Sequence, residues 1–356
     1  MGENHLSYFK IQNFKRFDSF EMENIGQFNL VVGDNNVGKT SVLEALSFND
    51  GVNILLSMVS NLRWRKILPN EEYNPSFELL LSLTLKDIKN PLLCEYANKN
   101  QKFSNSYKYL KQNNLTSEDK EYIKNQSYQA SISMNSEFLK NEKNDKTFDL
   151  YFLDNIFLKS EYSPLIFSNI KYNDDLLDYY FKEINSNKNQ REEFEKNLKA
   201  IIPNLDEIRT HKIDTFEFLA VSLINQNILS PITQFGDGVA KYARILLEIL
   251  MVKGNRLMID EIETGIHFSR LKDFWKTVIL LCKKYDVQLF ATTHSLECQK
   301  YFVEAFSELE EDDRAKARNI SMIEVPSGGV RSVTFNYEQL EFALEIGANT
   351  RGGERG

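Results

Sequence analysis

Residues 33–41 read GDNNVGKTS, between the apolar run FNLVV at residues 28–32 and the helix-like LEALSF at residues 43–48. Gly33 and Gly38 permit backbone conformations that are closed to other residues, so that successive N–H groups can turn inward around phosphate oxygens at a helix N-terminus. In such a loop Lys39 would reach the β- and γ-phosphates, and Thr40 would offer its hydroxyl to Mg²⁺. A glycine-rich turn that happens to precede Lys-Thr is the alternative, but the strand–loop–helix context favours a phosphate-binding loop. The residues predicted to contact phosphate are Gly33, Asp34, Asn35, Asn36, Val37, Gly38, Lys39, Thr40 and Ser41.

The composition limits what kind of protein carries this loop. A chain of 356 residues, of which 42% are hydrophobic, is long enough for one large core with an inserted lobe. Its cysteines form no CxxC pair and no cluster with histidines, which indicates neither disulfides nor zinc and fits a reducing cytoplasm. No apolar run has the length of a membrane span. The net charge of −8 argues against a broadly basic nucleic-acid clamp, so that any such contact would be confined to one face.

A pair of acids follows a second apolar run. Residues 256–261 read RLMIDE, which predicts a buried strand that ends in Asp260 and Glu261. Adjacent carboxylates at the end of a buried strand are costly unless a cation neutralises them. Asp260 is therefore placed to hold Mg²⁺, and Glu261 to polarise an attacking water. A strand that merely ends at the surface would give a similar apolar-then-acidic sequence, but together with Lys39 the two acids indicate a catalytic site.

A histidine ends the next apolar run, VQLFATTHS at residues 287–295. His294 stands about thirty residues after the acids, at the end of what is predicted to be the neighbouring strand. Its imidazole could hydrogen-bond the γ-phosphate or the attacking water. A packed strand-end histidine is the plainer alternative, and the spacing from the acids favours the functional role.

Upstream of the acids, Gly236 and Gly238 precede a strongly amphipathic helix in FGDGVAKYARIL, residues 235–246. This is a second helix N-terminus able to face phosphate. A monomer has no obvious use for two such ends at one nucleotide, whereas a head-to-tail dimer does. The glycine loop of one chain, Gly236, Asp237 and Gly238, would then cap the γ-phosphate held by Lys39 of the other.

Other segments carry weaker signals. The turn at residues 14–17, FKRF, could flank an adenine ring or could simply pack on the sheet, and the segment up to residue 26 is predicted to be a polar connection. The basic cluster RWRK, residues 63–66, favours a solvated helix end over a nucleic-acid contact. Residues 77–85 are predicted to be a strand. Residues 98–146 are predicted to be a polar insertion that contains a strand near residues 128–134, and a second strand at residues 148–153 follows it. Two amphipathic helices follow, at residues 174–184 and 191–202, with Leu177 among the residues assigned to the apolar stripe of the first.

In this order the segments GDNNVGKTS, FGDGVAKYARIL, LMIDEIETGIH and VQLFATTHS resemble the Walker A, signature, Walker B with D-loop, and H-loop elements of ABC-type ATPases. The group is that of RecF, SMC and the overcoming-lysogenization-defect (OLD) proteins. The likeness looks closest to the small stand-alone AAA-family ATPases of bacterial phage-defence systems, and it covers about residues 6–60 and 200–350.

The resemblance implies an α/β fold of the ABC-ATPase P-loop type, with a mixed central sheet, an antiparallel sub-sheet and an inserted helical lobe. The expected core comprises residues 1–60 and 205–350, the inserted lobe residues 61–204, and a flexible tail residues 351–356. OLD-type nucleases carry a Toprim domain after the ATPase. If this chain is complete, any nuclease or toxin activity is expected to come from a separate protein.

The resemblance also assigns roles. Lys39 and Thr40 would bind phosphates and Mg²⁺, Asp260 would be the Walker B metal ligand, Glu261 the catalytic base and His294 the switch histidine. The signature loop departs from the transporter pattern, with Gly236 where serine is common and Val239 where glutamine is common, so turnover is expected to be slow. No glutamine stands out as a Q-loop residue.

The expected function is that of a cytoplasmic ATPase that binds ATP and Mg²⁺. Its ATP-dependent homodimer, or higher oligomer, would control a separate effector, a nuclease or a toxin, in anti-phage defence, without a membrane partner. A RecF-like DNA-repair ATPase that acts on DNA is the main alternative. A transporter ATPase and a nucleotide sensor without significant turnover are further alternatives.

Overall fold

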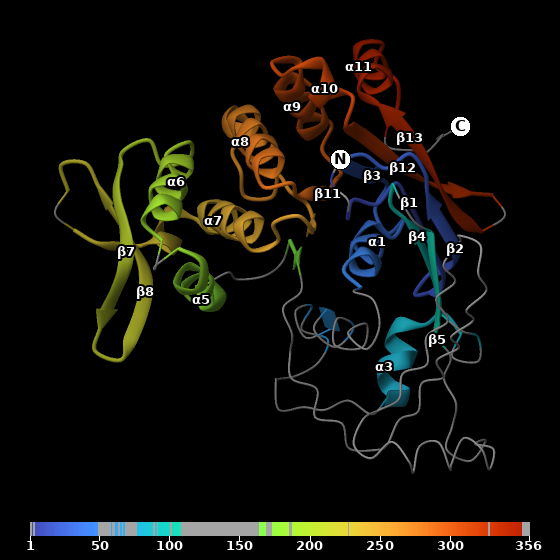
Figure 1. Cartoon of the computed structure of the whole chain (residues 1–356), viewed down its shortest axis with the longest axis horizontal. Helices are drawn as coiled ribbons and strands as arrows, with labels where there is room; N and C mark the ends of the chain where they lie inside the picture. The colour runs from blue at the N-terminus through green and yellow to red at the C-terminus, as the bar shows by residue number, and fades with distance from the viewer. Residues whose placement is uncertain are drawn as a thin grey trace.

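The computed structural model describes residues 2, 4–48, 58, 61–62, 65, 67, 77–87, 90, 92–99, 102–107, 164–168, 173–184, 187–226, 228–326 and 328–350. Their strands form three sheets, and helices surround the largest of these (Figure 1). The strands predicted near residues 128–134 and 148–153 lie outside the described residues.

The largest sheet has six strands in the order β13-β12-β3-β11-β10-β6. Neighbours run parallel except for β12 and β13, which are antiparallel, so the sheet is mixed, as predicted. Because β3, β10 and β11 are parallel, the segments that follow them leave the same edge of the sheet. The strands are β3 (Phe28–Gly33), β6 (Leu165–Ile166), β10 (Arg256–Ile259), β11 (Gln288–Thr293), β12 (Ala317–Val325) and β13 (Gly329–Asn336).

Both faces of this sheet are covered, which explains why its strands are nearly continuous apolar runs. Leu30 and Val32 of β3 join one core cluster, while Val31 between them joins the other. The first cluster includes residues of α7 (Asp237–Met251), α8 (Leu271–Lys284) and α9 (Leu296–Ser307). The second includes residues of α1 (Lys39–Leu46) and of a four-stranded sheet.

The four-stranded sheet is antiparallel, in the order β2-β1-β4-β5. It corrects two expectations. The predicted polar connection after residue 14 contains a strand, β2, whose Phe17, Phe20 and Met22 are buried, and the predicted polar insertion begins with β5, paired to β4. In both cases cross-strand pairing outweighs a polar local composition. The strands are β1 (Tyr8–Phe14), β2 (Phe17–Met22), β4 (Leu92–Ala97) and β5 (Lys102–Tyr107).

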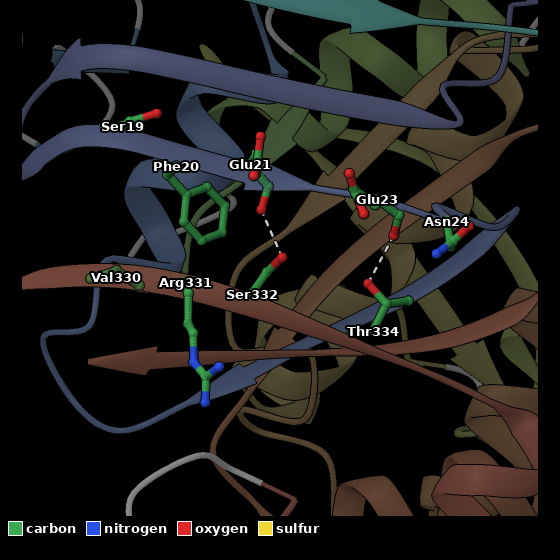
Figure 2. Close-up of a pocket in the computed structure, with 9 residues that line it drawn as sticks. All are labelled: Ser19, Phe20, Glu21, Glu23, Asn24, Val330, Arg331, Ser332 and Thr334. Atoms are coloured by element: carbon green, nitrogen blue, oxygen red, sulfur yellow. Dashed lines mark hydrogen bonds between the residues drawn. The ribbon is translucent and has the colours of Figure 1, made fainter. Parts of the chain in front are cut away.

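The two sheets meet where β13 lies against the free edge of β2, and Figure 2 shows this junction. Ser332 Oγ donates to the carbonyl oxygen of Glu21 at 2.6 Å, and Thr334 Oγ1 donates to that of Glu23 at 2.8 Å. An open groove of about 250 Å³ runs along the contact. The hydroxyl groups of one edge strand therefore bind the backbone of another.

A lobe built on α5 (Asn173–Glu183) and α6 (Lys188–Leu198) packs against α7, at the left of Figure 1. The antiparallel strands β7 (Leu205–Ile213), β8 (Phe216–Leu223) and β9 (Ser230–Pro231) complete it, and the 3-10 helix η2 (Ile232–Phe235) leads into α7. The two predicted helices are confirmed, but α5 buries Leu176 where the predicted stripe had Leu177. The domain boundaries at residues 60 and 205 stay a prediction.

Residues 77–85 form a helix, α3 (Phe77–Thr84), and not the predicted strand. The segment FELLLSLT has three consecutive leucines and no β-branched residue before Thr84, and leucine is among the best helix formers. Further helices are η3 (Phe268–Arg270), α10 (Glu311–Arg314) and α11 (Tyr337–Glu345). In the part of the chain that the structure describes, no helix has the length and apolar character needed to cross a membrane.

Candidate active site

The loop at residues 33–41 connects β3 to α1 at the carboxyl edge of the sheet. Gly38 caps α1 with φ of 104°, and a Cβ atom there would lie 2.5 Å from the ring of Phe17. Asn36 also has a positive φ, 64°. Left-handed residues in a turn before a helix form a concave nest of backbone amides, which suits an anion. Only glycine satisfies both the conformation and the space at position 38.

Lys39 lies over this loop. Its Nζ donates to the carbonyl oxygens of Gly33 at 2.8 Å and Asp34 at 2.9 Å. The residue is 8% exposed, and burial lowers the pKa of Lys39, while Asp260 and Glu261 oppose the shift. The ammonium group thus lies at the predicted phosphate-binding loop, and its contact with phosphate stays a prediction.

Asp260 follows β10 and meets α1 through Thr40. Thr40 Oγ1 lies 3.1 Å from both carboxylate oxygens of Asp260, and Thr292 Oγ1 donates to Oδ1 at 2.7 Å. The carboxylate is 6% exposed, and burial raises the pKa of Asp260. A buried carboxylate beside a threonine hydroxyl offers the hard oxygen ligands that Mg²⁺ prefers, and a cation here would offset the cost of its burial.

Glu261 and His294 come together at the same edge. Glu261 Oε1 lies 3.6 Å from Nε2 of His294, and Thr264 Oγ1 donates to Oε2 at 3.2 Å. Both side chains are partly exposed, 34% for Glu261 and 44% for His294. The predicted base and the predicted switch histidine are therefore neighbours that solvent reaches, next to the buried Asp260.

The glycine loop before α7 is placed differently from the phosphate-binding loop. Gly236 has φ of 98° and ψ of 158°, and both Gly236 and Asp237 are exposed. Gly238 is buried against the turn that follows Glu261, where a Cβ atom on Gly238 would lie 1.8 Å from the carbonyl oxygen of Gly265. Part of the loop thus faces solvent while its last glycine packs on the predicted D-loop of the same chain.

The turn between β1 and β2 lies beside the phosphate-binding loop. Phe14 and Phe17 are fully buried, which supports the packing interpretation for both aromatic residues. Lys15 pairs with the buried Glu44 of α1, whereas the Cδ atom of Arg16 would lie 3.1 Å from a Cβ atom on Gly38. The guanidinium group of Arg16 pairs with Glu324, with Nη2 donating to Oε1 at 2.5 Å, so both cations of this turn have an acidic partner.

Within RWRK only Arg65 is among the described residues. Its Nη1 also pairs with Glu44, at 2.8 Å, so Arg65 helps to neutralise a buried carboxylate on α1. This contact ties the residue to the protein and gives no support to a nucleic-acid contact at Arg65.

Three residues that sequence reasoning missed complete the site. Thr292 contacts both predicted acids, since its Oγ1 also accepts the N–H of Glu261 at 2.8 Å. Lys241 Nζ donates to the carbonyl oxygens of Asp260 and Glu261. The carbonyl group of Gly265 packs closely against Gly238. Two sequence features could have pointed to these residues. Thr292 is a hydroxyl residue near the end of a buried strand, and Lys241 is the single lysine of an otherwise mostly apolar helix.

A mostly parallel, mixed sheet with a phosphate-binding loop after β3 and acids after β10, flanked by an antiparallel sheet, defines a P-loop ATPase of the ABC type. The chain belongs to the family described as "AAA domain, putative AbiEii toxin, Type IV TA system", which matches residues 28–297. It is also 27% identical, over 96% of its length and 99% of the relative's, to an "ATP/GTP phosphatase" of Helicobacter pylori (strain ATCC 700392 / 26695).

Solved structures of SMC heads share the fold. One, an SMC head bound to the C-terminal winged-helix domain of ScpA, has a TM-score of 0.54 at 9% identity and covers 96% of this chain and 100% of that one. Another, an SMC head with an extended coiled coil bound to the C-terminal domain of ScpA derived from Pyrococcus furiosus, has a TM-score of 0.50 at 8% identity and covers 96% and 99%. These likenesses show that the chain shares the fold of SMC heads.

Proposed function

We propose that this ATPase hydrolyses ATP at a site shared between two copies of the chain, and that closing and opening of the dimer controls a separate effector. The observation that carries the proposal is the meeting of four predicted residues at one sheet edge. Thr40 lies 3.1 Å from Asp260, and Glu261 lies 3.6 Å from His294. Lys39 is on the loop beside them.

The chain's own residues can perform most of the chemistry by position and charge. Lys39 would leave its carbonyl partners for the β- and γ-phosphates, and the amides of the loop would bind their oxygens. Thr40 and Asp260 are the residues that would hold Mg²⁺, which when bound neutralises phosphate charge. Glu261, solvent-accessible and beside His294, would orient a water for in-line attack.

The dimer is inferred from the glycine loop before α7. Gly236 and Asp237 are exposed at a helix N-terminus, where backbone N–H groups favour an anion. Gly238 is already packed on Gly265 of its own chain. Such a loop could bind the γ-phosphate of a nucleotide held by a second copy of the chain. If each chain contacts the nucleotide of the other in this way, the two chains form a closed two-fold dimer with two nucleotides.

The effector and the setting are inferred from the family alone, which is an argument by analogy. We propose anti-phage defence, with a nuclease or toxin as the effector. Phage challenge of cells that carry this gene with its neighbouring reading frames tests the assignment. Lys39→Ala should restore plaque formation, and equal plaque counts for wild type and Lys39→Ala would speak against defence.

Glu261→Gln tests the site itself. Loss of the base should slow hydrolysis by about 10²- to 10⁴-fold while ATP binding is kept, so that the variant accumulates as an ATP-bound dimer in light scattering. Glu304→Gln, the same change on an exposed position of α9, is the control and should behave as wild type.

Lys39→Ala should bind no ATP in calorimetry and stay monomeric. If Glu261→Gln hydrolyses ATP normally, the assigned base is wrong. If it is inactive and binds ATP yet stays monomeric, dimerisation is wrong. Stimulation of the wild-type rate by DNA would favour a repair ATPase instead.

A further inference from the structure

Lys241 joins the helix of the predicted signature loop to the turn of the predicted base. It stands on α7, three residues after Gly238, and is 2% exposed. Its Nζ donates to the carbonyl oxygen of Asp260 at 3.2 Å and to that of Glu261 at 2.5 Å. A buried ammonium group is costly unless hydrogen bonds satisfy it, so these two carbonyl groups are what allow Lys241 to lie here.

The turn that Lys241 holds is strained. Glu261 has φ of 45°, in the left-handed region, which is unfavourable for a residue other than glycine. Its N–H donates to Thr292 Oγ1 at 2.8 Å, and its carbonyl oxygen accepts from Lys241. The backbone of Glu261 is thus fixed at both ends, once from β11 and once from α7. The direction of its side chain follows from that backbone conformation.

The start of α7 touches the same turn at a second point, through the contact of Gly238 with Gly265. Within this turn Glu263 is a further acceptor, since its Oε2 is buried without a hydrogen-bond partner among the described residues. Burial lowers the pKa of Lys241 to about 8, and the charge of Glu263 opposes that shift more than Asp260 or Glu261 does.

We propose that Lys241 is a positioning residue that couples the glycine loop of α7 to the backbone of Glu261 in the same chain. The coupling rests on the proposed dimer and deepens it. In that dimer the glycine loop of one chain meets the nucleotide held by its partner, while Glu261 of the first chain serves its own nucleotide. Lys241 then connects the two nucleotide sites, and occupation of one prepares the base of the other.

Lys241→Met tests this, because methionine keeps an unbranched apolar stem and removes the donors. The variant should lose about 10- to 100-fold in kcat, as expected for lost hydrogen bonds from a charged group, with the KM for ATP and the calorimetric affinity unchanged. Its Hill coefficient for ATP should fall to 1 from a wild-type value above 1. Lys241→Arg and Lys241→Gln keep donors, and at least one should exceed Lys241→Met in kcat.

Arg244→Met is the matched control. Arg244 is also buried on α7, but its Nε donates to Glu248 at 2.7 Å, so the variant perturbs the same helix away from Glu261. It should lower the melting temperature and leave kcat within a few-fold of wild type.

The proposal is overturned if Lys241→Met keeps the wild-type kcat, if Arg244→Met loses as much, or if neither donor variant exceeds methionine. None of these three outcomes would contradict the proposed dimer. A non-cooperative wild type whose Glu261→Gln variant stays monomeric would instead refute dimerisation and with it the link between sites, and the kcat comparison would still decide whether Lys241 positions Glu261.

Discussion

A mixing experiment tests whether the glycine loop acts on the nucleotide of a second copy. Gly236→Ala damages the loop with little side effect, because nothing lies within 4 Å of a Cβ atom at this position. The whole cost then comes from φ of 98° and ψ of 158°, a region that essentially only glycine occupies and that costs of order 1–3 kcal/mol in other residues. If the closed dimer needs this conformation, the ATPase rate should fall by about 5- to 150-fold.

The decisive measurement mixes Gly236→Ala chains, expected to be slow alone, with Lys39→Ala chains, expected to be inactive alone. In a mixed pair, Lys39 of the first chain meets Gly236 of the second, which restores one complete site. Roughly half of the pairs should be mixed, with one of two sites intact, so two independent sites would give about a quarter of the wild-type rate. The proposed coupling through Lys241 should lower this value, because the partner site is empty, but leave it above the average of the two separate rates.

Gly254→Ala is the control, with a positive φ of 72° and no atom within 4 Å of the added Cβ. It should lose similar stability and keep its activity. If the mixture shows only the average of the two separate rates, the glycine loop acts within its own chain and the shared site is refuted.

Two further predictions follow from the buried polar groups. Thr292→Val keeps the shape of the side chain but removes its hydrogen bonds to Asp260 and Glu261, so kcat should fall by about 10- to 100-fold; Thr277→Val, which removes a bond to the carbonyl oxygen of Asp273 on α8, is the control in the same assay. Burial lowers the pKa of His5, whose Nε2 contacts the carbonyl oxygen of Asp286 at 2.8 Å. Since the unfolded histidine takes up a proton near its ordinary pKa of about 6.5 while the folded one resists it, the free energy of unfolding should decrease as the pH falls below that value. Urea titrations between about pH 5 and 8 should show the decrease in wild type and a smaller one in His5→Gln, and equal slopes would contradict the assignment.

The residues with a fixed spacing around a strand end were predictable from the sequence. Lys39 and Thr40 follow one apolar run, Asp260 and Glu261 another and His294 a third, and parallel strands bring such ends together. The structure places them at one edge of the sheet.

What the sequence could not supply depends on contacts between distant segments. Lys241 and Thr292 are ordinary residues locally, and only the packing of α7 and β11 against the turn after β10 gives them partners. Strand β2 was missed because Asp18, Ser19 and Glu21 make it look polar, while its buried side chains need β1 and α1 to pack against. The opposite error occurred in α3, where a short apolar run fits either a helix or a strand.

The junction of β2 with β13 also bears on whether the edge of β2 can pair with a strand of another molecule. An edge strand with open carbonyl groups is a template on which a strand of another molecule can pair. Here Ser332 and Thr334 already occupy the carbonyl groups of Glu21, near the end of β2, and of Glu23, just after it. Side-chain hydroxyl groups thus bind the carbonyl groups to which a further strand would otherwise donate. Edge-to-edge pairing of another strand with β2 is blocked at these positions.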